Sequence, residues 1–186
     1  MTAAISRVGL VAKHRVDAAA AVLQELAAWL EARGIGPVFD NESAHLAGVR
    51  DQWETTSKED LPKACELIVL LGGDGTLIGM ARRIARANVD VPIAGVNFGS
   101  LGFLTEVRID ELYPTLDSVV NGTAEYHERA MLVADACRGG ECFDSRIVLN
   151  DVVFTKAALS RIIELSISVS TGLMTKVKAE DRKSVV

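Results

Sequence analysis

Residues 67–76 read LIVLLGGDGT, a run of five branched apolar residues followed by the glycine-rich segment GGDGT at 72–76. Such a run has the length and composition of a fully buried strand of a parallel sheet. The two successive glycines allow a tight turn in which backbone can approach a ligand closely, because no Cβ lies in the way. After the turn, apolar residues recur at helical spacing, namely Leu77, Ile78, Met80, Ala81, Ile84 and Ala85. The stretch therefore predicts a strand, a tight turn and a helix.

The turn has the chemistry of a phosphate-binding site. A glycine-rich strand-to-helix turn presents free backbone N–H groups and the positive end of a helix, and both attract phosphate. On this ground Gly73, Asp74, Gly75 and Thr76 are candidate binding residues. An acid at a phosphate site costs electrostatic energy unless it holds a metal, accepts a proton from a hydroxyl or binds a ribose. Asp74 therefore favours phosphoryl transfer, and the alternative is a purely structural turn in an α/β protein.

The composition is that of an ordinary globular protein. The chain has 186 residues, enough for one domain or two small ones, and 49% of them are apolar while 24% are charged. A net charge of −5 argues against a nucleic-acid binder held by a basic surface. Three cysteines without a nearby histidine cluster predict reduced thiols, with a metal pair at Cys137 and Cys142 as the alternative. Without a signal peptide or an apolar run of spanning length, we expect a cytoplasmic protein.

Strands and helices alternate in the first part of the chain. Strands are predicted over 7–12, 37–39, 67–71 and 91–97, with helices after Asp17, from the turn to about Asn88, and over 110–120. This order builds a parallel sheet through right-handed crossovers. Residues 40–63 are polar, and we expect a long irregular connection there. Ligands bind at the carboxyl ends of the strands in such sheets. Asn97 and the loop 98–106 therefore lie beside the turn if their strands are neighbours.

After Gly122 the pattern becomes mainly that of strands. Runs over 124–136 and 142–148 are separated by the hairpin signal Arg138-Gly139-Gly140, and 162–169 continues as strand. The apolar run 147–155 is broken by Asn150 and Asp151, which would be costly if buried without partners. That pair predicts a bulge or a strand end that faces a ligand.

The expected fold class is therefore α/β, with a Rossmann-like parallel sheet and flanking helices followed by a partial all-β domain of β-sandwich type. We place the α/β domain, which carries GGDGT, at residues 1–121 and the incomplete β-rich domain at 122–186.

Three segments together resemble the NAD kinase family. They are GGDGT at 72–76, GVN at 95–97 with LGFLT at 101–105, and LNDVV at 149–153. The resemblance extends to about Lys178 and so covers almost all of the chain. Diacylglycerol-type lipid kinases and phosphofructokinases share GGDGT or close variants of it, whereas the three segments in this order and spacing are specific to the NAD kinase family.

The resemblance implies transfer of the γ-phosphoryl group of ATP to the 2′-hydroxyl of the adenosine ribose of NAD, which gives NADP. Some members use inorganic polyphosphate, and a divalent cation, usually Mg²⁺, is needed. Asp74 matches the family's proton acceptor for that hydroxyl, which makes it the candidate catalytic residue. The resemblance implies that Gly75 lines the NAD site, and Phe103 matches a family residue that packs near the adenine. The family also implies a homodimer or homotetramer, and no residue of this chain is predicted to ligate a metal directly.

Further candidate NAD contacts lie in the β-rich part. Asn150 and Asp151 match the pair that holds NAD through polar contacts. Arg161 falls on a position that is often basic or histidine in the family, and Lys178 and Glu180 fall on a basic and an acidic position. The family usually has Asp-Gly where this chain has Glu180 and Asp181, which leaves the role of this pair open.

The end of the sequence departs from the family. Members continue with a segment like TPTGSTAY and with more β-sandwich, whereas residues 181–186 read DRKSVV. Because three or four strands cannot close a sandwich, we expect a fragment that is weak, unstable or inactive on its own. Two alternatives to an NAD kinase stay open. One is a lipid or sphingoid-base kinase, which usually has Asn-Glu after GGDGT where this chain has Leu77-Ile78-Gly79. The other is a non-catalytic nucleotide-binding module.

Overall fold

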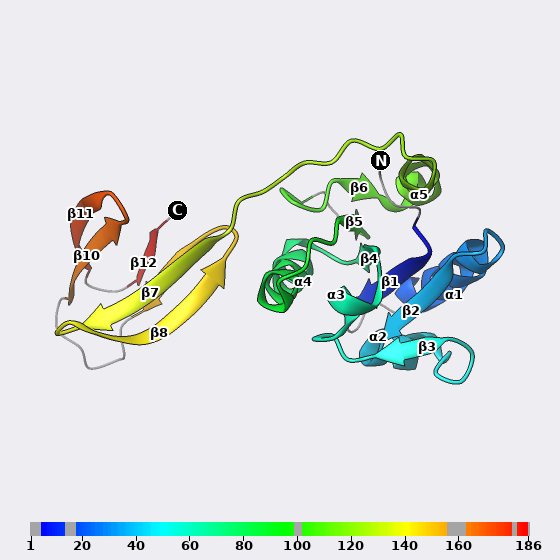
Figure 1. The fold of residues 1–186 in the computed structure, drawn as a ribbon, viewed down its shortest axis with the longest axis horizontal. Coiled ribbons are helices and arrows are strands. Elements are labelled where there is room, and N and C mark those ends of the chain that lie inside the picture. The colour runs from blue at the N-terminus through cyan, green and yellow to red at the C-terminus, as the bar shows by residue number, and fades with distance from the viewer. Residues whose placement is uncertain (1–4, 14–17, 99–101, 156–162, 180–181, 186) are drawn as a thin grey trace. The chain divides into compact units, whose positions relative to one another are not determined.

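The computed structural model describes residues 5–13, 18–98, 102–155, 163–179 and 182–185 (Figure 1). The chain forms two compact units, residues 1–129 and 130–186, and each is described by itself. Among the described residues, no helix is both long enough and apolar enough to cross a membrane.

A six-stranded parallel sheet forms the centre of the first unit, with the strand order β3-β2-β1-β4-β5-β6 (Figure 1). The strands are β1 (Arg7–Ala12), β2 (Gly36–Asp40), β3 (Glu54–Thr56), β4 (Leu67–Leu71), β5 (Ile93–Asn97) and β6 (Val107–Arg108). The chain runs from β1 outward to β3 on one side and then crosses to β4 on the other. Strand order therefore reverses between β1 and β4, and ligands bind in open α/β sheets at the carboxyl ends of strands around such a reversal.

Helices cover both faces of this sheet. They are α1 (Ala18–Glu31), α2 (Asn41–Ala47), α3 (Leu61–Ala64), α4 (Asp74–Ala87), a 3₁₀ turn η1 (Ile109–Glu111) and α5 (Leu112–Val120). Buried residues of α1, α2 and α5 form one core with the sheet, and buried residues of α3 and α4 form a second core. The α/β layering with a parallel sheet is the fold class that the sequence predicts for this part.

The strand before the glycine-rich turn divides its side chains between the two cores. Leu67, Val69 and Leu71 belong to the core under α1, α2 and α5, while Ile68 and Leu70 belong to the core under α3 and α4. All five are at most 1% exposed. Because side chains alternate between the faces of a strand, a continuous apolar run indicates a strand covered on both faces. The prediction of a fully buried strand is confirmed.

The prediction of an irregular connection over residues 40–63 is wrong, because the segment contains α2, β3 and α3. Asp40 ends β2 and caps α2 by accepting a hydrogen bond from the backbone N–H of Glu42 at 3.1 Å. Gly48 ends the same helix in the left-handed region, with φ of 67°. These elements have seven, three and four residues, which is too few for a helical or strand period to become visible in sequence.

A buried hydrogen-bond chain joins β1 to α2. The backbone N–H of Ala12 donates to Oγ of Ser43 at 2.8 Å, and the Ser43 hydroxyl donates to Oδ1 of Asp40. Asp40 and Ser43 are at most 1% exposed. Burial raises the pKa of Asp40 above its ordinary value, although the Ser43 hydroxyl and Lys58 act in the opposite direction. Ser43 therefore satisfies a buried donor and a buried acceptor at once.

Ser43→Ala is expected to lower the free energy of unfolding by about 1–3 kcal/mol, because the N–H of Ala12 and the carboxylate of Asp40 both lose a buried partner. Urea unfolding of wild type and variant measures the loss. Ser6→Ala is the matched control, because the Ser6 hydroxyl bonds to Glu66 at the exposed surface and its removal should cost under about 0.5 kcal/mol. Equal losses in the two variants would contradict the role given to Ser43.

In the described part of the second unit, strands form three antiparallel pairs. The pairs are β7 (Leu132–Arg138) with β8 (Glu141–Val148), β9 (Val152–Thr155) with β12 (Arg182–Val185), and β10 (Ile163–Val169) with β11 (Gly172–Ala179). The strand predicted from residue 124 begins only at Leu132. Its expected first residues stay with the first unit, since the N–H groups of Thr123 and Ala124 both donate to the backbone oxygen of Ser118.

The hairpin between β7 and β8 has the predicted turn. Gly139 and Gly140 form a two-residue loop with φ of 61° and 88°, and two positive φ values in succession are what a type I′ hairpin requires. Cys137 and Cys142 face each other across the turn and form a disulfide. The prediction of reduced thiols is therefore wrong for this pair, because it considered the number of cysteines and not the hairpin register. Cys65 is free and buried, and burial raises its pKa to about 11.

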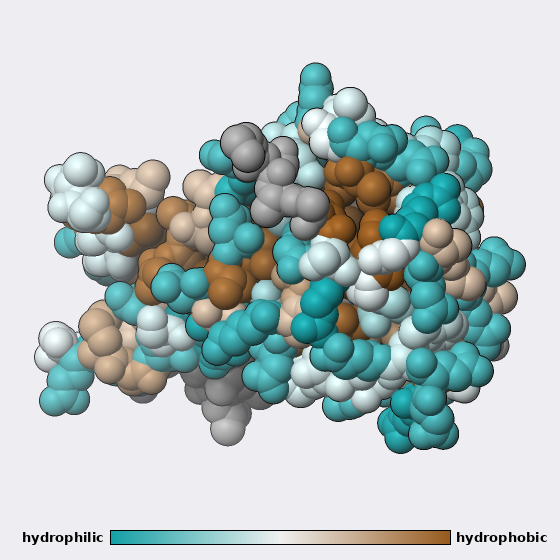
Figure 2. All heavy atoms as spheres, turned by 45° about the vertical axis from the view of Figure 1, so that its right-hand side comes forward, coloured by the Kyte–Doolittle hydropathy of each residue, from teal (hydrophilic) through white to brown (hydrophobic). Residues whose placement is uncertain are grey.

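Large apolar side chains are exposed in the second unit. Figure 2 shows brown, apolar residues at the surface among teal, polar ones. Among its described residues, five large apolar residues are at least 59% exposed, namely Leu132, Val133, Phe143, Leu173 and Met174. Isolated strand pairs cannot cover both of their faces, so apolar side chains remain accessible on them.

Candidate functional site

The glycine-rich turn lies at the carboxyl end of β4. Gly73 is the N-cap of α4 and Asp74 is its first residue. β4 pairs with β5, so the end of β5 at Asn97 is adjacent to the turn, and the backbone N–H of Gly72 donates to the oxygen of Val96 at 2.8 Å. The two strands are thus the neighbours that the sequence argument required.

Asp74 is held by the segment that follows β5. Its Oδ2 accepts a hydrogen bond from the backbone N–H of Phe103 at 2.8 Å. Its Oδ1 accepts three, from the N–H of Leu104 at 3.1 Å, the N–H of Thr105 at 3.0 Å and the Thr105 hydroxyl at 3.0 Å. Three successive N–H groups that converge on one carboxylate form an anion-binding nest. The nest fixes the orientation of Asp74 at the edge of the sheet.

Gly102 permits this close approach. A Cβ at residue 102 would lie 2.0 Å from Oδ1 of Asp74 and 2.6 Å from Oγ1 of Thr105. Gly102 and Thr105 are part of the LGFLT segment, but neither was predicted as a site residue. The only hint of Gly102 in the sequence is its place directly before Phe103, which is a predicted site residue. The contact itself depends on how the loop folds back onto α4, which residue spacing does not encode.

The pKa of Asp74 reflects two opposing influences. Burial raises it, but the hydrogen bonds from Thr105, Phe103 and Leu104 together outweigh burial, so the pKa lies below its ordinary value. Donors that point at a carboxylate stabilise its charged form. Asp74 is therefore an ionised hydrogen-bond acceptor at neutral pH.

The lowered pKa predicts how stability depends on pH. A carboxyl group with a lower pKa in the folded state than in the unfolded state stabilises the fold fully above the unfolded value of about 4, and this contribution is lost as the pH falls through the folded value. We expect the difference in unfolding free energy between wild type and Asp74→Asn to stay constant from about pH 7 to 5 and to shrink below about pH 4. Urea unfolding across this range measures it. A difference that grows on acidification would contradict the hydrogen-bonded state of Asp74.

Space for a ligand lies next to the turn. A Cβ added at Gly73 or Gly75 would meet no heavy atom within 4 Å, and Gly75 is exposed. Thr76 is half-buried and its N–H donates to the oxygen of Gly73 at 2.9 Å, which closes the first turn of α4. The N-terminus of a helix attracts negatively charged groups. Phosphate could therefore approach the backbone at Gly73 and Gly75.

Phe103 stands out by its exposure, because 92% of it is accessible while its own N–H is bonded to Asp74. An aromatic ring in this position offers a free face for stacking on a planar group. Asn97 is half-buried, and its Nδ2 donates to Oγ1 of Thr105 at 3.1 Å. The structure thus brings Asp74, Asn97 and Phe103 together around one segment.

The other predicted NAD contacts belong to the second unit. Asn150 and Asp151 are exposed and lie between the end of β8 and the start of β9, as expected for a strand end. Lys178 is exposed in β11 and lies opposite Glu164 of β10. Arg161 and Glu180 lie outside the described residues. Because the two units are described separately, the structure does not place these side chains relative to Asp74.

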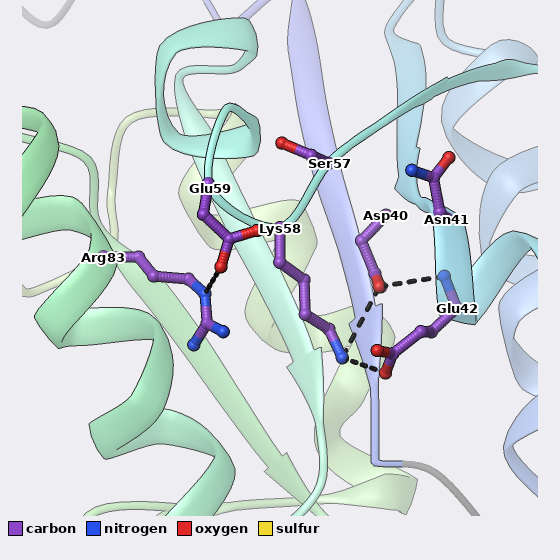
Figure 3. A pocket seen from close by; sticks show the side chains of 7 residues that line it. All are labelled: Asp40, Asn41, Glu42, Ser57, Lys58, Glu59 and Arg83. Carbon is purple, nitrogen blue, oxygen red and sulfur yellow. Dashed lines mark hydrogen bonds and ion pairs between the residues drawn. The ribbon is translucent and has the colours of Figure 1, made fainter.

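A polar pocket lies at the carboxyl ends of β2 and β3, away from the glycine-rich turn (Figure 3). It is lined by Asp40, Asn41, Glu42, Ser57, Lys58, Glu59 and Arg83. Lys58 reaches between Asp40 and Glu42, and Arg83 pairs with Glu59 at 3.0 Å (Figure 3). Charges of opposite sign therefore meet inside the pocket itself, whereas the space at Gly73 and Gly75 adjoins a helix N-terminus.

Comparison with known proteins agrees with the geometry. A sequence profile described as the ATP-NAD kinase N-terminal domain matches residues 8–124, which include the Asp74 nest and all of the parallel sheet except Arg7, the first residue of β1. The chain belongs to the ATP-NAD kinase family. The NAD kinase of Geobacter sulfurreducens is 44% identical over 176 residues, and that of Solibacter usitatus is 35% identical over 177 residues. Each match covers 95% of this chain, which spans 60% of the length of either relative.

A solved structure shows the same fold. The crystal structure of yeast NADH kinase complexed with NADH superposes with a TM-score of 0.79 at 17% identity. The match covers 96% of this chain and 57% of the yeast chain. It confirms the fold class, an α/β domain followed by β-rich structure.

Proposed function

We propose that this chain takes part in NAD kinase chemistry, the transfer of a phosphoryl group from ATP or polyphosphate to the 2′-hydroxyl of the adenosine ribose of NAD, with NADP as the product. The observation that carries the proposal is the Asp74 carboxylate, oriented at the carboxyl end of β4 by four hydrogen bonds. An oriented carboxylate beside an open, glycine-rich helix N-terminus combines a hydroxyl acceptor with a phosphate-attracting surface. Membership of the ATP-NAD kinase family supports the choice of NAD as acceptor.

Asp74 would act on the attacking hydroxyl. Its lowered pKa makes it a weak base, so it orients the hydroxyl first and takes the proton only as that oxygen bonds to phosphorus and becomes acidic. Phosphoryl transfer depends mainly on positioning and on electrostatic stabilisation of the transferred group. A weak but firmly held acceptor suits such a reaction.

The remaining candidate residues would bind the substrates. Gly73, Gly75 and Thr76 form the turn toward which phosphate is attracted, and Asn97 lies beside it. The exposed ring of Phe103 would stack on the adenine.

In the second unit, Asn150, Asp151, Arg161, Lys178 and Glu180 would hold NAD, as the matching family positions imply. We accordingly propose that residues 1–121 carry the chemistry and that residues 122–186 belong to an NAD-binding domain. A cytoplasmic location and self-association as a homodimer or homotetramer are further proposals that rest on the family.

A divalent cation is expected with ATP, and Mg²⁺ is the usual one. Among the residues that the structure describes, no group of three or more His, Cys, Asp or Glu side chains could hold a metal ion. Oδ1 of Asp74 already accepts three hydrogen bonds, so we expect a cation beside the turn to be held mainly by groups other than Oδ1. Mg²⁺ at such sites is bound largely by substrate phosphates and water, and it neutralises phosphate charge there.

Two measurements on the chain test the proposal. NADP formation from NAD, ATP and Mg²⁺ is followed with an NADP-specific dehydrogenase, and NAD binding is followed by calorimetric titration. We expect NAD to bind weakly and NADP to form slowly, in line with the weak activity that the sequence predicts for this chain on its own. Binding without NADP would indicate a non-catalytic nucleotide-binding module, and an absence of both would contradict the proposal.

A further inference from the structure

Behind the Asp74 carboxylate, two side chains form a directed hydrogen-bond chain. Nδ2 of Asn97 donates to Oγ1 of Thr105 at 3.1 Å, and the Thr105 hydroxyl donates to Oδ1 of Asp74 at 3.0 Å. An amide nitrogen can only donate, so the bond from Asn97 occupies an acceptor position on the hydroxyl. The single hydroxyl proton is therefore left to point at Asp74. Asn97 therefore fixes the direction of the Thr105 hydroxyl.

The two carboxylate oxygens of Asp74 accept different numbers of hydrogen bonds. Among the donors of the described residues, Oδ1 accepts three hydrogen bonds, two from the backbone and one from the Thr105 hydroxyl, whereas Oδ2 accepts one, from Phe103. Each carboxylate oxygen has about two lone-pair positions. Oδ1 is therefore saturated, and Oδ2 is the oxygen with room for another donor.

The surroundings of Thr105 are built for its side chain. Thr105 is 0% exposed. A Cβ at Gly95 of β5 would lie 3.2 Å from Cγ2 of Thr105 and 2.8 Å from Cδ1 of Leu77, so the absence of a side chain at Gly95 makes the space that Thr105 fills. A buried hydroxyl needs hydrogen-bond partners, and Asn97 and Asp74 provide them.

We propose that Thr105, oriented by Asn97, is a positioning residue that saturates Oδ1 of Asp74 and so presents Oδ2 to the substrate hydroxyl. This inference rests on the proposed function, since it assigns the oxygen that receives the proton. Thr105 acts through Asp74 and does not itself meet the substrate.

Two substitutions separate the hydroxyl of Thr105 from its packing. Thr105→Val keeps the shape and both methyl-sized branches but loses the hydroxyl, while Thr105→Ser keeps the hydroxyl and loses the methyl group. The pKa of Asp74 is measured from the pH dependence of the ¹³C NMR signal of its carboxyl carbon, in the chain without substrates. The values of kcat and KM for NAD are measured from the rate of NADP formation. Thermal unfolding of each variant reports on packing.

We expect Thr105→Val to raise the pKa of Asp74 relative to wild type and to lower kcat at least about tenfold, with a smaller change in KM. Thr105→Ser should have a pKa of Asp74 and a kcat close to those of wild type, even if it unfolds at a lower temperature. An unchanged Asp74 titration in Thr105→Val, or equal losses of kcat in the two variants, would overturn the inference. The pKa of Asp74 could depend on the Thr105 hydroxyl while wild type makes no NADP. That result would contradict the proposed function but would still support the hydrogen bond from Thr105 to Asp74.

Discussion

Gly102→Ala is expected to lower NADP formation by at least about 100-fold, because the new methyl group would displace the carboxylate on which the proposed reaction depends. A Cβ at this position would lie 2.0 Å from Oδ1 and 2.6 Å from Cγ of Asp74, distances that no side-chain contact sustains. Either Asp74 or the 102–105 segment must move, and both movements break the nest of N–H donors. The coupled assay measures turnover, and ¹³C NMR of the Asp74 carboxyl should show its pKa raised toward the ordinary value.

Gly79→Ala is the matched control for this substitution. A Cβ at residue 79 would lie 3.6 Å from Nη1 of Arg83, which is an ordinary contact. Because Gly79 lies inside α4, alanine should stabilise the helix by up to about 1 kcal/mol and leave turnover unchanged. Wild-type activity in Gly102→Ala would show that the contact between Gly102 and Asp74 is not needed for the reaction.

Asp74→Asn is expected to lower NADP formation by about 100- to 10,000-fold while the fold persists. The amide has no negative charge with which to accept the proton of the attacking ribose hydroxyl. In addition, one of its two terminal groups is an NH₂ donor. That donor must face either the N–H of Phe103 or the donors from Leu104 and Thr105, so the side chain cannot keep its orientation. Circular dichroism checks the fold, and calorimetry checks that NAD still binds.

The control for this change is Asp110→Asn in the same unit. Asp110 is exposed and pairs with Arg108 at 3.1 Å on the surface, so removal of its charge should change neither turnover nor stability by a measurable amount. If Asp74→Asn turned over NAD at the wild-type rate, Asp74 would have no catalytic role.

The larger elements of the first unit could be predicted from sequence because each carries its own signal. β4 is a five-residue apolar run that is buried on both faces, and α5 buries Leu112, Leu116 and Val119 at helical spacing. Burial imposes these periods on the sequence, so the periods indicate the elements. The pairing of β4 with β5, which the sequence argument required as a condition, places Asn97 beside Asp74.

Contacts made by backbone or by short elements could not be predicted in this way. The nest around Asp74 consists of N–H groups that any residue would provide, so only Gly102 leaves a trace in the sequence. Helix α2 has seven residues and is specified by Asp40 as its cap. The Cys137–Cys142 disulfide follows from the register of one hairpin. For the nest and the disulfide, the deciding information is the path of the chain, whereas the cap of α2 is a single residue that no helical period accompanies.

NMR titration of the ¹⁵N-labelled chain with NAD tests whether the ribose of NAD binds at the Asp74 nest. We predict that the amide signals of Phe103, Leu104 and Thr105 move first and furthest, because their N–H groups bond to the carboxylate that would receive the ribose hydroxyl. If only signals from the polar pocket around Lys58 shifted and these three amide signals stayed unmoved, the ribose of NAD would not bind at the Asp74 nest.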